Sequence, residues 1–257
     1  MFRQAQGRVI SNEPVNAFWR VLWLSAPAVT QGAGPGQFAM LRCSDGFDPL
    51  LPRPMTYHRL RLVDGERQMA FLYRPGGRGT TWLAARRPGD EVRLFGPLGR
   101  GFALKAEARN LLLVAGGTGI AGLVALAEEA LSQGRAVALL MGARMAQELL
   151  PIELLSPEVE VAVATDDGSS GHRGPVTELL PGYLPWADQI FACGPRPMFE
   201  SLAQLLRRLG SRKSVQVLLE ERMACGTGIC YGCATETRRG MRLVCKDGPM
   251  FELREVF

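Results

Sequence analysis

Four of the six cysteines lie close together near the C-terminal end of the sequence, where their thiolates could bind a metal or carry electrons. Cys225, Cys230 and Cys233 follow a C-x4-C-x2-C spacing, and Cys245 comes after eleven further residues. The first fourteen residues contain no apolar signal region, so we expect a cytoplasmic protein whose thiols stay reduced. In that compartment a dense cysteine cluster indicates a metal or redox site rather than a disulfide framework.

The spacing of these cysteines distinguishes between two kinds of metal site. A C-x4-C-x2-C run with a distant fourth cysteine is typical of a plant-type [2Fe-2S] cluster. Gly226, Gly228 and Gly232 would let backbone N–H groups approach the sulfur atoms of such a cluster. Structural zinc sites favour two short C-x2-C pairs, which this segment lacks. The pattern therefore favours a [2Fe-2S] cluster with four cysteine ligands, and a zinc site or free thiols are the alternatives.

A glycine-rich loop, Gly117-Thr118-Gly119 followed by Gly122, joins an apolar run at 111–115 to a predicted helix. Backbone N–H groups at the start of such a helix can hold a diphosphate. The acidic residue that binds a ribose in many dinucleotide-binding folds is missing, because the next predicted strand runs into Gly142-Ala143-Arg144. A nucleotide site is therefore one interpretation of the loop, and a tight turn without a ligand is the other.

Two further groups of residues could take part in chemistry. Cys193-Gly194-Pro195 ends a later predicted strand, where a sharp turn would present the thiol to the ligand crevice of an open sheet. A purely structural turn is the alternative. Glu220, Glu221 and Arg222 precede the cysteine cluster, and we interpret them as ion pairs within that segment.

The elements that must position these residues change in character along the chain. Up to residue 105, short strands at 15–23, 38–42, 57–62 and 69–73 alternate with Gly, Pro and Asp clusters, and one helix is expected over 80–85. This pattern predicts a small antiparallel β-barrel over residues 1–105.

From residue 106 onward, strands alternate with helices. Strands are expected at 111–115, 136–141, 159–164, 189–192 and 215–219, and helices at 120–132 and 197–209. Such alternation predicts an α/β domain with a doubly wound parallel sheet over residues 106–219. Residues 220–257 form a third domain, which is too short and too rich in cysteine to fold without a metal or cluster.

Composition excludes several classes of protein. The chain has 257 residues, of which 47% are hydrophobic and 21% charged, so disorder, collagen and coiled coil are ruled out. The uncharged runs at 21–41 and 110–127 are interrupted by Gly or Pro, and we expect no membrane span. Residues 53–109 contain 12 Lys or Arg against five acids, which indicates a phosphorylated cofactor, a polyanion or an acidic partner. We do not expect a nucleic-acid partner.

Taken together, these motifs resemble the ferredoxin–NADP reductase superfamily. Arg53-Pro54-Met55-Thr56 is similar to its first flavin-binding element, and Leu72-Tyr73-Arg74 followed by Gly79-Thr80 is similar to the second. The glycine loop and Cys193-Gly194-Pro195 resemble its nicotinamide-side motifs. The tail from Glu220 to Cys233 resembles the electron-transfer subunit of NAD-dependent dihydroorotate dehydrogenase. The chain departs from many relatives at Gly122, where proline is common, and at Met55, where a smaller aliphatic is common.

The resemblance implies FAD, one [2Fe-2S] cluster and NAD, held by a flavin barrel, a nucleotide domain and a cluster domain. It also implies an oxidoreductase subunit in pyrimidine biosynthesis whose partner is an FMN-containing catalytic subunit that oxidises dihydroorotate, in a heterotetramer of two each. A flavin exchanges electrons both singly and in pairs, so FAD belongs between the cluster and the nicotinamide.

The resemblance also assigns roles to residues. Arg53 would bind FAD phosphate, Thr56 the isoalloxazine ring, and Gly79 and Thr80 the FAD diphosphate, while Pro54, Met55, Leu72, Tyr73 and Arg74 complete the flavin site. Gly117, Thr118 and Gly119 would carry the NAD diphosphate, and Cys193, Gly194 and Pro195 would lie near the nicotinamide. The alternatives are a reductase subunit of a ferredoxin-dependent transhydrogenase or hydrogenase, and a zinc-binding module. NAD and NADP both remain open, because Arg144 could favour a phosphate.

Overall fold

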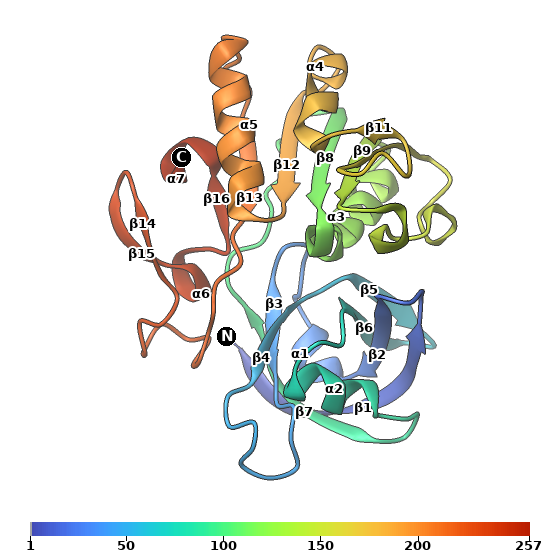
Figure 1. Ribbon diagram of the computed structural model, residues 1–257. Coiled ribbons are helices and arrows are strands. Elements are labelled where there is room, and N and C mark those ends of the chain that lie inside the picture. The colour runs from blue at the N-terminus through green and yellow to red at the C-terminus, as the bar shows by residue number, and fades with distance from the viewer. Residues whose placement is uncertain (1) are drawn as a thin grey trace.

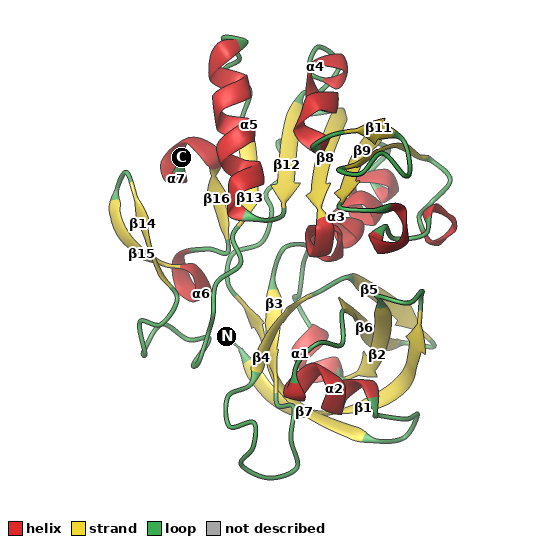
Figure 2. Cartoon of the chain, viewed as in Figure 1, coloured by secondary structure: helices red, strands yellow, loops and turns green. Residues whose placement is uncertain are grey.

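The computed structural model describes residues 2–257, which form two seven-stranded sheets and a smaller C-terminal segment. In Figure 1 the antiparallel sheet lies below the parallel one, and the red C-terminal segment runs along one side of both. Figure 2 shows that helices flank the upper sheet, whereas the lower domain consists mostly of strands. The order of the two domains along the chain is the order that the sequence predicts.

The N-terminal domain is an antiparallel sheet in the order β4-β3-β7-β1-β2-β6-β5. Its strands are β1 (Arg3–Pro14), β2 (Arg20–Ser25), β3 (Phe38–Leu41), β4 (Arg53–Thr56), β5 (Arg59–Val63), β6 (Glu66–Tyr73) and β7 (Glu91–Leu98). Two short helices, α1 (Pro27–Thr30) and α2 (Arg78–Ala84), accompany it. The strands β4 and β5 lie at opposite ends of the sheet order, yet only two residues separate them. The sheet must therefore curl into a half-barrel around buried side chains such as Tyr57 and Phe71.

Two expectations for this domain are wrong in detail. The predicted strand at 15–23 begins only at Arg20, because Asn16 Oδ1 accepts hydrogen bonds from the backbone N–H groups of Phe18 (2.8 Å) and Trp19 (2.9 Å) and closes a turn. The long strand β1 was not predicted at all. Its sequence is mostly polar, and it is held by pairing with β2 on one side and β7 on the other.

The second domain contains the expected parallel sheet, in the order β11-β10-β9-β8-β12-β13-β16. Its strands are β8 (Asn110–Gly116), β9 (Ala136–Ala143), β10 (Val159–Thr165), β11 (His172–Arg173), β12 (Gln189–Cys193), β13 (Val215–Leu218) and β16 (Met250–Glu252). The main helices are α3 (Ile120–Ser132), α4 (Leu180–Tyr183) and α5 (Arg196–Arg208). The helices α3 and α5 pack against opposite faces of the sheet. Alternate residues of β8 therefore lie in two separate cores, one beneath each helix.

The C-terminal segment leaves β13 and then returns to the same sheet. It contains the hairpin β14 (Ala234–Thr237) and β15 (Gly240–Leu243), the short helix α6 (Val244–Asp247), and finally β16 and α7 (Leu253–Val256). The strand β16 pairs with β13 and is antiparallel to it. The cysteine segment is thus anchored at its end by the nucleotide-domain sheet. The division of the chain at residues 105 and 219 remains a prediction.

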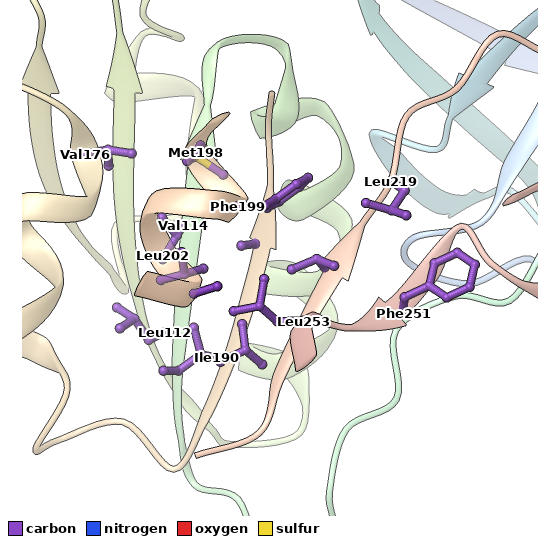
Figure 3. Close-up of a cluster of buried hydrophobic side chains, with 14 of the residues drawn as sticks. Leu112, Val114, Val176, Ile190, Met198, Phe199, Leu202, Leu219, Phe251 and Leu253 are labelled. Carbon is purple, nitrogen blue, oxygen red and sulfur yellow. The ribbon is translucent and has the colours of Figure 1, made fainter. Parts of the chain in front are cut away.

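A shared hydrophobic core fixes this return. Figure 3 shows Phe251 and Leu253 of the C-terminal segment on the same side of the sheet as Phe199 and Leu202 of α5. Phe251 is 4% exposed and Leu253 is 2% exposed. Burial of such side chains contributes about 1.5–3 kcal/mol each, so the packing of the C-terminal segment contributes directly to the stability of the nucleotide domain. No helix within residues 2–257 is both long and apolar enough to cross a membrane.

Candidate cofactor cavities and cysteine cluster

A cavity of about 860 Å³ lies where the half-barrel, the nucleotide domain and the C-terminal segment meet. The half-barrel contributes eight of the residues that the sequence predicts for flavin binding, namely Arg53, Pro54, Met55, Thr56, Leu72, Tyr73, Arg74 and Thr80. The other wall comes from Thr118 and Ala121 of the glycine loop and from residues 219–223. The cavity is at the upper end of the usual volume of a ligand site, about 300–1,000 Å³, and it suits a large cofactor.

Gly79 is the one predicted flavin residue that does not line this cavity. A Cβ atom at Gly79 would lie 3.1 Å from Arg53 Nε and 3.1 Å from Cys43 Cβ. Glycine at this position therefore leaves room for the Arg53 side chain to cross the start of α2. Thr80 sits one residue later, and its Oγ1 accepts hydrogen bonds from the N–H groups of Gly76 and Gly77, both at 3.1 Å. These contacts order the turn that enters α2.

A second cavity, of about 490 Å³, opens at the carboxyl ends of the parallel strands. It is lined by Gly117 and Thr118 after β8, Arg144 after β9, and Pro195 after β12. Ligands of open α/β sheets bind at this end, where the crossover direction changes. Arg74, Thr118 and Glu220 line both cavities, so the two spaces adjoin.

The three residues of the glycine loop differ in their surroundings. Gly117 has a φ of +53°, and nothing lies within 4 Å of the position of a Cβ atom, so its backbone is open to the second cavity. A Cβ atom at Gly119 would lie only 1.9 Å from the carbonyl oxygen of Cys193. Gly119 therefore serves the close packing of α3 on β12. Within residues 2–257, the lining of the second cavity does not include Gly119, Cys193 or Gly194.

Cys193 and Glu220 meet beside the junction of the two cavities. Cys193 Sγ lies 4.0 Å from Glu220 Oε1. The thiol is 1% exposed, and burial together with the nearby carboxylate raises its pKa well above the usual value. Glu220 has surface open to the cavities but is crowded by protein atoms, and this desolvation raises the pKa of its carboxyl. The interpretation of Glu220, Glu221 and Arg222 as ion pairs is wrong, since no ion pair within residues 2–257 involves any of them.

The sequence did not predict the network of ion pairs around Glu148. Glu148 Oε1 lies 2.5 Å from Arg144 Nη2 and 3.4 Å from Arg74 Nη1. Hydrogen bonding from Arg144 is the main reason that the pKa of Glu148 is lowered. Because Arg74 follows β6 of the half-barrel, the network joins the two domains at the second cavity. Glu148 follows Arg144 by four residues, a spacing that favours ion pairs, and this spacing is the sequence signal that could have predicted their contact.

The four clustered cysteines form two pairs. Cys225 contacts Cys230, and Cys233 contacts Cys245. Cys225 Sγ accepts hydrogen bonds from the backbone N–H groups of Thr227, Ile229 and Cys230, each at 3.4 Å. Burial alone would raise the pKa of Cys225, but these N–H groups outweigh it and lower the pKa to about 6. The loop is therefore shaped to hold a thiolate.

Glycines shape the loop that carries these cysteines. Over residues 2–257, no three His, Cys, Asp or Glu side chains gather closely enough to hold a single ion. Gly226 and Gly228 have φ angles of +67° and +84°, which let the loop turn its N–H groups toward sulfur. Cys43 and Cys193 lie outside this cluster, and both are buried.

Comparison with known proteins identifies the family. Residues 220–257 match the model of the iron–sulfur cluster binding domain of dihydroorotate dehydrogenase B. The electron transfer subunit of dihydroorotate dehydrogenase B (NAD(+)) from Geobacillus sp. (strain WCH70) is 35% identical over 261 aligned positions, which cover 100% of this chain and 99% of the relative. The chain belongs to this family of electron transfer subunits. The corresponding subunit from Desulforamulus reducens is 37% identical and covers 88% of this chain and 87% of its own length.

Structural comparison supports the fold. A chain of NADH-dependent reduced ferredoxin–NADP oxidoreductase superposes with a TM-score of 0.85 at 26% identity, covering 98% of this chain and 90% of its own. A ferredoxin–NADP+ reductase from Neisseria gonorrhoeae shares the fold, with a TM-score of 0.65 at 19% identity over 80% of this chain and 92% of its own. The predicted family, the flavin half-barrel with an α/β nucleotide domain, and the oxidoreductase class of this subunit are confirmed.

The family also decides between the kinds of cofactor. An iron–sulfur cluster binding domain at residues 220–257, in a chain that matches the relatives over its whole length, implies an iron–sulfur cluster. The alternative of a zinc-binding module is therefore excluded. The full-length relatives are dihydroorotate dehydrogenase B subunits, which disfavours the alternative of a transhydrogenase or hydrogenase subunit.

Proposed function

We propose that this electron transfer subunit carries electrons from a [2Fe-2S] cluster at Cys225, Cys230, Cys233 and Cys245, through FAD, to NAD+. The electrons would come from an FMN-containing catalytic subunit that oxidises dihydroorotate in pyrimidine biosynthesis, in a heterotetramer of two of each subunit. The observation that carries this proposal is the adjacency of the two cavities at Thr118 and Glu220. A flavin exchanges electrons both singly and as hydride, so FAD would supply the link between a one-electron and a two-electron carrier.

The cysteine loop is held against the flavin cavity by the chain itself. The cavity wall runs from Leu219 to Met223, and Cys225 follows two residues later. A Cβ atom at Gly226 would lie 2.7 Å from Met40 Cγ of β3, so the loop packs directly on the half-barrel. The strand β3 also places Phe38 in the cavity wall. A cluster on this loop and a flavin in this cavity would therefore be neighbours, as electron transfer requires.

The predicted flavin residues offer suitable chemistry. Arg53 lies beside the turn that enters α2 and can bind a phosphate through its planar guanidinium. Thr56 and the backbone of β4 can hydrogen-bond a flat polar ring, while Leu72 and Tyr73 supply apolar surface. On the nucleotide side, the open backbone of Gly117 suits a diphosphate. The Glu148 carboxylate neutralises Arg144 where a 2′-phosphate would lie, which favours NAD over NADP.

The surface around the cluster loop suits a protein partner. Cys230 is exposed, and its neighbours Ile229 and Tyr231 are 79% and 69% exposed. Tyr231 has a φ of +60°, a conformation that a non-glycine residue adopts only when its surroundings hold it there. We infer that the catalytic subunit docks over this tip, which would bring its FMN toward the cluster.

Co-expression with a candidate FMN-containing catalytic subunit tests the proposal. The purified complex should reduce NAD+ when dihydroorotate is added. It should contain two irons and two sulfides per electron transfer subunit, as a binuclear cluster requires. Cys230→Ser should abolish the cluster spectrum and dihydroorotate-dependent NAD+ reduction. Cys43→Ser serves as the matched control, because Cys43 is buried in the half-barrel core away from the cluster. A complex that reduces NAD+ equally well with Cys230→Ser would refute the proposed route.

A further inference from the structure

A basic cavity of about 360 Å³ lies at the edge of the nucleotide-domain sheet formed by β13 and β16. Its walls come from the end of α5, the loop that follows it, β13, the turn between β14 and β15, and α7. It shares no lining residue with the flavin or nucleotide cavity. None of the motifs discussed above contributes to it, so the proposed electron route does not account for it.

The charge of this cavity is strongly one-sided. Five cationic side chains line it, from Arg207, Arg212, Lys213, Arg238 and Arg254, and the only lining carboxylate side chain is that of Glu252. Glu252 accepts hydrogen bonds from the Ser214 hydroxyl at 3.1 and 3.2 Å, so its partner here is a neutral group. The cavity therefore carries a local excess of positive charge.

The five cations make no close ion pair with a side chain, although Lys213 lies near enough to Asp188 to help lower the pKa of that carboxyl. Across the described chain, no salt bridge to a carboxylate side chain includes any of the five. Arg254 Nη2 donates to Ser211 O at 2.7 Å, and Lys213 Nζ donates to Ala187 O. Arg238 Nη2 and Arg207 Nη1 donate to the same oxygen, Phe257 O, at 3.1 and 3.4 Å. These main-chain contacts fix the direction of the guanidinium groups toward the cavity walls. Like charges held together in this way repel one another, and an anion between them would relieve the repulsion.

The shape of the cavity indicates the class of anion. Leu206, Val215 and Phe257 provide an apolar lining beneath the cations. The volume is at the lower end of the range for small-molecule sites, about 300–1,000 Å³. Guanidinium groups match the geometry of phosphate oxygens and bind them through paired N–H donors. We propose that this cavity is a binding site for a small phosphate-bearing anion, separate from the flavin and nucleotide sites.

A ligand here would join two parts of the chain. Arg207, Arg212 and Lys213 belong to the nucleotide domain, whereas Arg238 and Arg254 belong to the segment that carries the clustered cysteines. An anion that contacts both sets holds the C-terminal segment against the sheet. Because a ligand that binds only the folded protein stabilises it, occupancy should raise the melting temperature in proportion to the logarithm of the ligand concentration.

Titration calorimetry with inorganic pyrophosphate tests this site. The protein is used with FAD bound and with NAD+ at saturation, so that the diphosphate-binding parts of those sites are filled, and the ionic strength is held constant with potassium chloride. We expect one pyrophosphate bound per chain. In Arg212→Ser/Arg254→Ser the affinity should fall about tenfold or more, because two charge-assisted contacts are lost.

Arg208→Ser/Arg239→Ser is the matched control. It removes the same charge from exposed residues next to Arg207 and Arg238 that do not line the cavity, and its affinity should stay within about twofold of the unmodified protein. Should the cavity variant fold poorly, Arg212→Ser alone still tests the site, since the Arg212 side chain makes no hydrogen bond within residues 2–257 that could be lost. Absence of pyrophosphate binding, or equal weakening in cavity and control variants, overturns the proposal. Neither outcome depends on dihydroorotate or NAD+ turnover.

Discussion

Cys193 Sγ lies 4.0 Å from Glu220 Oε1, and this contact ties the end of β12 to the first residue of the cysteine segment. Glu220 lines both the flavin and the nucleotide cavity, whereas the Cys193 thiol is buried behind it. Both groups have raised pKa values, because burial of the thiol and crowding of the carboxyl by protein atoms disfavour their charged forms. The pair therefore favours a neutral thiol beside a carboxyl that holds its proton to a higher pH than an exposed glutamate.

Glu220→Gln should change how stability depends on pH. Because the pKa of Glu220 is raised on folding, its contribution to stability is greatest below the usual glutamate pKa and declines as the pH rises through the folded value. Glutamine cannot ionise, so the melting temperature of the variant should gain on that of the unmodified protein between pH 4 and pH 8. Differential scanning calorimetry across this range measures the gain. A difference that stays constant with pH would show that Glu220 is not desolvated as described.

Substitution of the two loop glycines should have unequal effects. In Gly119→Ala the new methyl group would lie 1.9 Å from the carbonyl oxygen of Cys193, so α3 or β12 must shift, at a cost of about 1–3 kcal/mol or more. Gly117→Ala meets no neighbouring atom and pays about 1 kcal/mol for its positive φ. Urea denaturation should therefore rank Gly119→Ala as the less stable variant. Equal stabilities would contradict the packing role of Gly119.

Glu148→Gln should shift the preference between nicotinamide cofactors. The substitution removes the negative charge that neutralises Arg144 and Arg74 at the rim of the nucleotide cavity. A 2′-phosphate would then meet an unpaired guanidinium, so we expect the ratio of kcat/KM for NADPH to that for NADH to rise several-fold. Reduction of ferricyanide by each cofactor gives this ratio. Glu153→Gln, outside the nucleotide cavity, is the control and should leave the ratio unchanged.

The contribution of the Glu148 carboxylate to stability should depend on pH in the opposite direction to that of Glu220. Since the pKa of Glu148 is lowered in the folded protein, its ion pairs stabilise the fold above the usual glutamate pKa. That contribution is lost as the pH falls through the lowered value. The stability difference between the unmodified protein and Glu148→Gln should therefore shrink in acid, which denaturation at pH 3 and pH 7 measures. A difference as large at pH 3 as at pH 7 would rule out the ionised pairs as its source.

Much of this architecture could be predicted from the sequence because its signals are local. The buried strands of the nucleotide domain are continuous apolar runs, and α3 begins and ends at the predicted residues, Ile120 and Ser132. The flavin residues were predicted by resemblance, and all of them except Gly79 line one cavity. The cysteine spacing likewise indicated a cluster before any geometry was known.

The features that were missed depend on contacts between distant residues. β1 has a polar sequence and becomes a strand only because β2 and β7 pair with it. The roles of Gly117 and Gly119 look alike in sequence, yet one is open and the other is pressed against Cys193. The ion pair between Arg74 and Glu148 joins side chains that are 74 positions apart, which no local pattern reveals.

Phe251→Ala tests whether the cysteine segment depends on its return to the nucleotide-domain sheet. Phe251 is 4% exposed in β16 and packs into the core beneath α5. Its truncation should cost about 3–5 kcal/mol and loosen the end of the segment that carries the cluster cysteines. Urea denaturation measures the loss, and the visible spectrum of the iron–sulfur protein should fade at a lower urea concentration than in the unmodified chain. Met241→Ala is the control in the same segment, because Met241 is 62% exposed and should cost less than about 0.5 kcal/mol. If both variants lost stability equally, the segment would be held by something other than this core.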